Sequence, residues 1–283
     1  MKAINLIAII LFTIAGISCA SNSETSAQTN LEELQFAKGD VNVTYLGNEG
    51  VLIAVKEKKV LIDGLHRKYL EEYAYPPDDL REKIEQAKGE FSGIDLVLVS
   101  HIHGDHFHPE SVGKLLMNER HVMLVSSPQV VESMESGFAD FEKIKGKVNA
   151  VDFEIGKESD LPMGIFVRYL GLSHGSGRHA SIQNLGHVVQ VGSINFLHLG
   201  DADTSEENFE PFDLEKANID VAFIPFWYLL DAKGREMVDR QFNPKRIIAV
   251  HVDVNEAERI KKDLQAADPR IRVFTEILET ATF

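Results

Sequence analysis

The sequence Ser-His-Ile-His-Gly-Asp-His-Phe-His-Pro begins at residue 100 and gathers three histidines and one aspartate within six residues. His101 and His103 are two residues apart, so in an extended chain their side chains project to the same side. Gly104 then allows the backbone to turn. Asp105 and His106 follow that turn and are expected to point to a neighbouring position in space. Imidazole and carboxylate donors together suit zinc, manganese or iron, so one loop is predicted to serve two metal positions.

This cluster lies between two predicted elements. The apolar run Asp95–Val99 predicts a buried strand before it, and Pro109–Met117 predicts a helix after it, with proline in the first turn. Many strands with helices interspersed indicate an α/β protein in which two sheets pack together and are covered by helices. The other predicted strands are Val41–Leu46, Val51–Val55, Lys59–Ile62, His121–Val125, Ile165–Leu170, His187–Val191, Ile194–Leu199, Val221–Ile224, Ile247–Val250 and Ile271–Phe274. The other predicted helices are Asp78–Ala87, Pro128–Glu135, Asp231–Phe242 and Glu256–Ala266.

His-x-His-x-Asp-His is the signature of the metallo-β-lactamase-fold superfamily, and the chain resembles this family at four further points in the expected order. They are an aspartate after an early strand, a histidine about seventy residues after the cluster, a Gly-Asp pair closing a strand, and a histidine ending a late strand. The matching residues are Asp63, His174, Gly200-Asp201 and His251. The resemblance spans roughly residues 41–252. Tyr45–Gly50 and the segment around Pro225 are most similar to the branch that contains ascorbate-6-phosphate lactonase.

The resemblance implies a four-layer αββα sandwich with two divalent metal ions at one edge of its two sheets. Zinc is the preferred ion, with manganese and iron as alternatives. Asp63 would orient the ligands by hydrogen bonding and Asp105 would also accept a proton, so these two are the predicted catalytic residues. The implied ligands are His101, His103 and His174 for the first ion, Asp105, His106 and His251 for the second, and Asp201 as a bridge.

The third histidine of the first metal position has rivals in the sequence. His179 and His187 both follow His174, although His187 is expected to start a strand and either pack or face solvent. His198 is expected within a strand, in a structural or supporting role. The remaining candidates are expected at the surface or as satisfied polar residues: His66, His108 and His121.

A site of this kind is typical of a hydrolase. Two divalent ions lower the pKa of a bridging water from about 16 towards neutrality and polarise a carbonyl or phosphoryl oxygen. The sequence has no glycine-rich nucleotide motif. We therefore predict that metal-bound hydroxide cleaves an ester, lactone, amide or phosphodiester. Two alternatives stay open: a mononuclear iron oxidoreductase of the same fold, of the persulfide dioxygenase type, and a metal-binding lipoprotein without turnover.

Two parts of the sequence are candidates for substrate binding. The segment Phe223–Leu230 follows a predicted strand and carries the only tryptophan, so Phe226, Trp227 or Tyr228 is predicted to line an apolar cleft, with Trp227 and Tyr228 preferred. Core packing after a buried strand is the competing interpretation. Arg178 would meet a phosphate or carboxylate of the substrate, unless it is an ordinary surface charge.

The N-terminus is typical of an exported protein. Lys2 precedes an apolar run of 14 residues, Ile4–Ile17, which is shorter than the ~20 residues of a membrane-spanning helix. Small residues follow it, so a signal peptide is predicted over residues 1–20. The only cysteine, Cys19, stands where a bacterial lipoprotein carries its lipid, so a lipoprotein leader over residues 1–18 is the alternative. The protein is therefore expected in the periplasm, or anchored to the cell envelope through a lipidated Cys19.

The exported part is predicted to consist of a flexible tether over residues 21–38 and one hydrolase domain over residues 39–283. The whole chain has 29 basic and 44 acidic residues, a formal net charge of −15. Because affinity for nucleic acid rests mainly on lysine and arginine contacts, a small molecule is predicted as the substrate and a nucleic acid is not.

Overall fold

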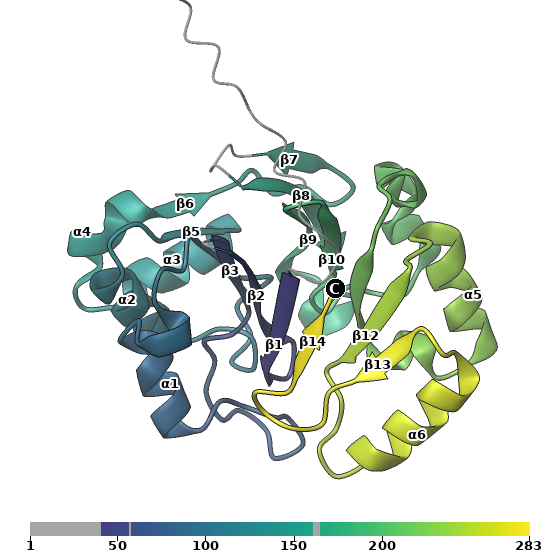
Figure 1. Cartoon of the computed structure of the whole chain (residues 1–283). Helices are drawn as coiled ribbons and strands as arrows, with labels where there is room; N and C mark the ends of the chain where they lie inside the picture. The colour runs from purple at the N-terminus through teal and green to yellow at the C-terminus, as the bar shows by residue number, and fades with distance from the viewer. Residues whose placement is uncertain (1–40, 57, 161–164) are drawn as a thin grey trace, which may run out of the picture. The chain divides into compact units, whose positions relative to one another are not determined.

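The structure, a computed structural model, describes residues 41–56, 58–160 and 165–283, and within these the strands form two seven-stranded sheets (Figure 1). The first sheet has, in order across it, β14 (Thr280–Thr282), β1 (Val41–Gly47), β2 (Gly50–Val55), β3 (Lys58–Ile62), β4 (Leu96–Leu98), β5 (Met123–Ser126) and β6 (Val148–Ala150). The second has β13 (Ile271–Val273), β12 (Arg246–Val250), β11 (Val221–Pro225), β10 (Ile194–His198), β9 (Gln183–Val191), β8 (Phe166–Ser173) and β7 (Glu158–Asp160).

Both sheets combine antiparallel and parallel pairing in the same way. In the first sheet, β14, β1, β2 and β3 pair antiparallel, and β3 to β6 pair parallel. In the second sheet, β7 to β10 pair antiparallel and β10 to β13 pair parallel. The parallel strands of each sheet end at a common edge, so residues that directly follow β4, β10 and β12 are brought to the ends of the strands.

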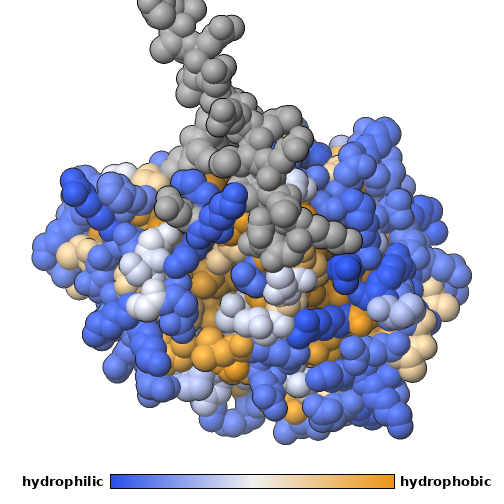
Figure 2. Space-filling model, in the orientation of Figure 1, coloured by the Kyte–Doolittle hydropathy of each residue, from blue (hydrophilic) through white to orange (hydrophobic). Residues whose placement is uncertain are grey.

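The main core lies between the two sheets and follows from the alternation of side chains along the strands. In β1, Val41, Val43 and Tyr45 are buried on the inner face, and Val189 and Phe223 face them from the second sheet. Figure 2 shows hydrophobic residues between the two halves of the domain and mainly hydrophilic residues towards its flanks. The two sheets are therefore held together by apolar side chains packed between them. This core is separate from the apolar contacts that the outer helices make.

Helices cover the outer face of each sheet (Figure 1). On α2, Val112, Leu115 and Leu116 are buried at the spacing of one helical face and pack on the first sheet. On α6, Ile260 and Leu264 pack on the second sheet in the same way. The helices are α1 (Asp78–Glu85), α2 (Pro109–Asn118), α3 (Pro128–Gly137), α4 (Phe141–Ile144), α5 (Ala232–Gln241) and α6 (Ala257–Ala267). The short 3-10 turns are η1 (Gly89–Phe91), η2 (Lys145–Lys147), η3 (Gly177–His179), η4 (Glu206–Asn208), η5 (Glu210–Phe212), η6 (Leu214–Lys216) and η7 (Phe226–Leu229).

The predicted architecture of two packed sheets covered by helices is confirmed. Each predicted strand and helix is present within a few residues of its expected ends. One boundary changes an interpretation: β9 begins at Gln183, so His187 lies inside a strand and is buried, and the expectation that it starts the strand was wrong. Apart from the 3-10 turns, the elements that were not predicted are short: β6, β7, β14 and α4.

The predicted signal peptide over residues 1–20, the lipoprotein leader over 1–18 and the tether over 21–38 lie outside the residues that the structure describes. Cys19 lies outside them too. Across the part of the chain that is described, no helix combines the length and the apolar character needed to cross a bilayer.

Candidate metal centre

The loop between β4 and α2 carries the histidine cluster. It is closed by backbone hydrogen bonds from His106 N–H and Phe107 N–H to the carbonyl of His103, at 3.1 and 3.0 Å. The chain turns at Gly104, as expected, although the φ of this glycine is not positive. The ring of the exposed Tyr69 would lie 2.7 Å from a Cβ added there, so the glycine also leaves room for this side chain.

The first group of donors consists of His101, His103, His174 and Asp201, whose ligand atoms all lie within 4.8 Å of one another. Nδ1 of His103 lies 3.0 Å from Nε2 of His101 and 3.2 Å from Nε2 of His174. Burial lowers the pKa of His101 well below its usual range and that of His103 to about 4. The imidazoles are therefore neutral at ordinary pH, which is the form that binds a metal ion.

The second group consists of Asp105, His106 and His251, again with ligand atoms within 4.8 Å. Nε2 of His251 lies 3.3 Å from Oδ2 of Asp105, and Nε2 of His106 lies 3.6 Å from the same oxygen. Burial disfavours charge on His251, but Asp201 and Asp105 outweigh it and raise its pKa to about 10. The carboxylates therefore favour positive charge at this point, whether it comes from a proton or from a metal ion.

Asp201 lies between the two groups and turns one oxygen to each. Its Oδ2 is 3.6 Å from Nε2 of His174, and its Oδ1 is 3.4 Å from Nε2 of His106. His251 is also on the Oδ1 side, at 3.5 Å. The side chain directly follows β10 and Gly200, whose φ of +55° lets the chain leave the strand. A carboxylate in this position has the geometry of a bridging ligand.

Asp63 supports the histidine loop through hydrogen bonds to Ser100 and His106. Its Oδ1 accepts a hydrogen bond from Ser100 N–H at 2.8 Å, and its Oδ2 accepts one from the Ser100 hydroxyl at 2.5 Å. Nδ1–H of His106 donates to the same Oδ2 at 2.9 Å. This contact fixes the His106 tautomer, so Nε2 is left to face the donors of the second group.

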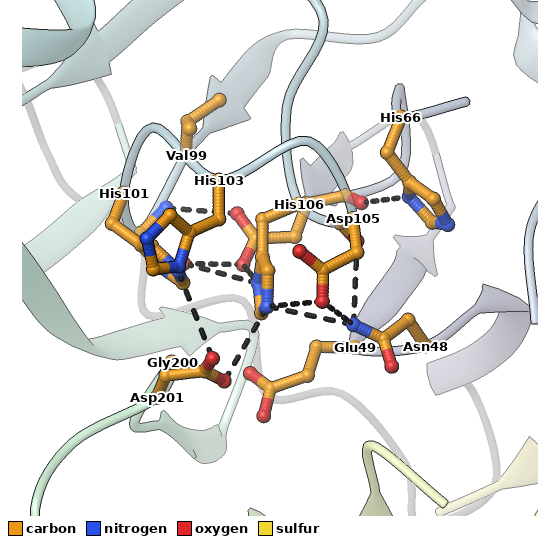
Figure 3. A network of polar contacts seen from close by, with 12 residues as sticks. Asn48, Glu49, His66, Val99, His101, His103, Asp105, His106, Gly200 and Asp201 are labelled. Carbon is orange, nitrogen blue, oxygen red and sulfur yellow. Dashed lines mark hydrogen bonds and ion pairs between the residues drawn. The ribbon is translucent and has the colours of Figure 1, made fainter. Parts of the chain in front are cut away.

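The turn between β1 and β2 contacts the second donor group, and these contacts were not predicted from the sequence. The side-chain amide of Asn48 donates to Oδ2 of Asp105 at 3.0 Å, and the Asn48 carbonyl accepts from His251 N–H at 3.1 Å. Glu49 beside it is fully buried (Figure 3). Burial and the charge of Asp201 raise the pKa of Glu49 to about 8. A Gly-x-x-Gly turn with two polar residues between apolar strands was the available signal.

The other histidines take different positions. His179 stacks on His174 with the ring centroids 4.8 Å apart, but it belongs to neither donor group. His187 is buried beneath the centre, and both of its ring nitrogens lack a hydrogen-bond partner among the described residues. His198 is buried, and its Nε2–H donates to the carbonyl of Glu49 at 3.2 Å. His66 is buried near two backbone carbonyls, His121 is exposed and His108 is partly exposed.

Two adjoining cavities open on the donors. One, of about 400 Å³, is bordered by His103, Asp105 and His174 and by a wall of Tyr69, Leu70, Tyr73, Arg178 and His179. The other, of about 350 Å³, lies beside His251 and is lined by Tyr73, Thr204 and Trp227 among others. The ring of Trp227 stands edge-on to that of His251, with centroids 5.0 Å apart.

The expectation for Tyr228 requires correction. Its side chain is 1% exposed, and its hydroxyl donates to the carbonyl of Ala202 at 2.6 Å. The turn η7 therefore points successive aromatic residues in different directions, with Tyr228 in the core and Trp227 at the cavity. Arg178 does border a cavity, with its Nε–H donating to Nε2 of His179 at 2.9 Å.

Comparison with known proteins agrees with the fold. The family model of the beta-lactamase superfamily domain matches residues 60–274. The chain belongs to the beta-lactamase superfamily. The resemblance predicted from the histidine cluster is thus confirmed, and the two helix-covered sheets are the metallo-β-lactamase fold of this superfamily.

Individual members of the superfamily are similar over most of the chain. A UPF0173 metal-dependent hydrolase of Pyrococcus abyssi is 25% identical over 216 residues, which cover 75% of this chain and 84% of the relative. A solved structure of a possible metal-dependent hydrolase from Veillonella parvula has a TM-score of 0.59 and 17% identity, and the match covers 87% of this chain and all of that one. A metallo hydrolase of Ignicoccus hospitalis gives a TM-score of 0.55 at 18% identity, over 86% of this chain and 98% of its own.

Proposed function

We propose that this protein is a metal-dependent hydrolase with a dinuclear centre. The observation that carries the proposal is the division of seven donors into two groups, with the two oxygens of Asp201 turned to one group each. The neutral imidazoles of the first group and the carboxylates of Asp105 and Asp201 fit a pair of divalent ions, with zinc preferred over manganese or iron. The names of the relatives, metal-dependent hydrolases, support the same activity.

The chain's own groups have distinct tasks in this proposal. Two divalent ions, when bound, supply an activated water and polarise the bond to be cleaved. Asp105 is held by Asn48 and His251 through Oδ2 and would serve both as a ligand and as a proton acceptor. Asp63 keeps His106 in the tautomer that ligation requires. The proposed substrate is a small molecule with an ester, lactone, amide or phosphodiester bond.

The cavity walls support a substrate that has an apolar part and an anionic part. Tyr69 and Leu70 border the larger cavity although they are 54% and 42% exposed, so they offer apolar surface at its entrance. Arg178 on the same cavity would pair with a carboxylate or phosphate of the substrate. Trp227 would contact the substrate from the adjoining cavity, next to His251.

Elemental analysis of the mature protein, purified without added metal or chelator, tests the proposal. Two zinc or manganese ions per chain are expected, together with turnover in a screen of esters, lactones and phosphodiesters. The turnover should be lost in Asp105→Asn. One iron per chain would instead favour an oxidoreductase, and a protein that binds no metal even after reconstitution would overturn the proposal. Two metals without turnover on any such substrate would favour a binding lipoprotein.

Replacement of Trp227 by alanine is expected to change the substrate preference and leave the metal content unchanged. The side chain borders the cavity and touches His251 only through its ring edge. The kcat/KM for a bulky aromatic ester, divided by the kcat/KM for an acetyl ester, should fall by about tenfold. This is the scale of one lost apolar contact. Trp227→Phe serves as the matched control and should retain most of the preference. Loss of metal or of folding in Trp227→Ala would contradict a substrate-binding role.

We also propose that the protein is exported and attached to the cell envelope through Cys19. The support is the sequence of residues 1–20 alone. Cell fractionation is expected to place the intact protein with the membranes and a Cys19→Ser variant in the soluble periplasmic fraction or uncleaved. Mass spectrometry of the mature N-terminus gives a second readout, since a lipidated cysteine adds the mass of its acyl chains. A mature protein that begins after residue 20 would rule out the lipid anchor but not export.

A further inference from the structure

The side chain of Glu49 enters the metal centre from the side of the molecular core. It lies in the turn between β1 and β2, and the carboxylate is fully buried beneath His106 and beside Asp201 (Figure 3). The turn is held in place by His251 N–H, which donates to the neighbouring Asn48 carbonyl at 3.1 Å. The position of Glu49 is therefore fixed by the same residues that form the second donor group.

The carboxylate oxygens of Glu49 have no hydrogen-bond partner among the described residues. One polar group close to it is the imidazole of His198, whose Nε2 is 3.5 Å from Oε2 of Glu49. The hydrogen on this nitrogen is already used, because Nδ1 of His198 accepts from Gly200 N–H and its Nε2–H donates to the backbone carbonyl of Glu49. A charged carboxylate buried without a donor is costly, so Glu49 is ionised here only with a positive partner beside it.

A positive ion could be placed next to Glu49 at the position beside His106 and Asp201. One ligand atom of each of these residues and one oxygen of Glu49 lie within 4.8 Å of one another. Two oxygen or nitrogen ligands of one zinc ion, each about 2.1 Å from it, are at most about 4.2 Å apart. A small movement of a buried glutamate therefore suffices to share an ion with both neighbours.

The opposite side of Glu49 does not offer such a position. Asp63 and His198 also lie within 4.8 Å of Glu49 in a group of three. However, both oxygens of Asp63 already accept hydrogen bonds from Ser100, one of them also from His106. The proton on Nε2 of His198 faces Glu49, so that nitrogen has no lone pair for an ion.

We propose that Glu49 is an additional ligand of the second metal position, beside the seven donors that the superfamily resemblance implies. The inference rests on the proposed dinuclear centre. It adds a third carboxylate to Asp105 and Asp201, so the ligands carry three negative charges against the four positive charges of two divalent ions. Carboxylate-rich sites suit manganese and other oxygen-preferring ions better than histidine-rich sites do. Glu49 is thus the residue expected to shift the second position towards manganese.

The test is metal binding by full-length mature protein after chelation, measured by titration calorimetry with Mn²⁺ and, separately, with Zn²⁺. Glu49→Gln keeps the shape and removes the charge. We expect it to weaken the second equivalent of Mn²⁺ at least tenfold, to weaken Zn²⁺ less, and to leave the first equivalent unchanged. Glu85→Gln is the matched control, since Glu85 is also buried but is paired with Arg67 and Arg81 away from the centre.

The outcomes separate the two proposals. If the wild type binds two ions and Glu49→Gln binds both metals as tightly, the role of Glu49 is overturned and the dinuclear centre stands. If the wild type binds fewer than two ions, the proposed function itself fails. Should Glu49→Gln not fold, a crystal structure of the Mn²⁺-loaded wild type decides, with anomalous scattering to locate the ions. An ion within about 2.3 Å of a Glu49 oxygen is expected, and a separation beyond about 3.5 Å overturns the inference.

Discussion

Replacement of Asp201 by alanine is expected to remove metal from both positions at once. The two oxygens of Asp201 face different donor groups, at 3.6 Å from His174 and 3.4 Å from His106, so neither group stays complete without it. Metal content should fall below one ion per chain in a protein purified without added metal. Turnover should fall by at least about a hundredfold, the scale of losing one preorganised charge from an active site.

The control for this experiment is Asp263→Asn, a change of an exposed carboxylate on α6 that pairs only with Arg259 among the contacts described. It should keep both metal and activity. Circular dichroism at 20 °C should show that Asp201→Ala is folded, because the inter-sheet core does not depend on this residue. An Asp201→Ala protein that retains two ions per chain would show that Asp201 is not a bridge.

Acid is expected to destabilise the protein through His187, which lies beneath the metal centre. Burial lowers the pKa of His187 from 6.5 to about 3 in the folded protein. The unfolded chain therefore binds a proton below pH 6.5 that the folded chain does not, and the free energy of unfolding falls as the pH drops through this range. Between pH 7 and pH 5 the loss from this one residue is about 2 kcal/mol, and it continues to about pH 3.

The variant His187→Leu isolates this contribution. Neither ring nitrogen of His187 has a hydrogen-bond partner in the described structure, so an apolar side chain of similar size removes two unsatisfied groups. Urea unfolding of metal-free protein at pH 7 and at pH 5 measures the difference. The wild type should lose about 2 kcal/mol more than the variant between the two values. Equal losses in the two proteins would show that the imidazole is hydrated or already paired, and the prediction would fail.

The sequence predicted the fold, and the family resemblance implied the seven donors that the structure brings together. Each donor directly follows a buried strand or lies in the loop after one, and parallel strands bring such positions to one edge of a sheet. The choice of His174 over its rivals depended on the family resemblance. In the structure His174 joins His101 and His103. His187 is buried as the fifth residue of β9, and His179 stacks on His174 without belonging to the donor group.

Other parts of the site could not be predicted from local patterns. Asn48 and Glu49 contact the centre only because the β1–β2 turn of the first sheet meets residues that follow strands of the second. Such a contact between distant segments leaves no periodic signal in the sequence. Trp227 borders a cavity and Tyr228 is buried because both lie in the 3-10 turn η7. The preceding strand does not determine in which direction the side chains of this turn point.

The donors come from distant parts of the chain, so they become available in a fixed order as the chain is synthesised. The loop after β4 supplies His101, His103, Asp105 and His106 early in the chain, whereas His174, Asp201 and His251 come from the later half. A partly synthesised chain therefore offers only an incomplete set of donors, and the proposed metal centre is complete only once His251, near the C-terminal end, has been made. Tight binding of the proposed metal ions therefore requires that both halves of the domain have folded and packed together.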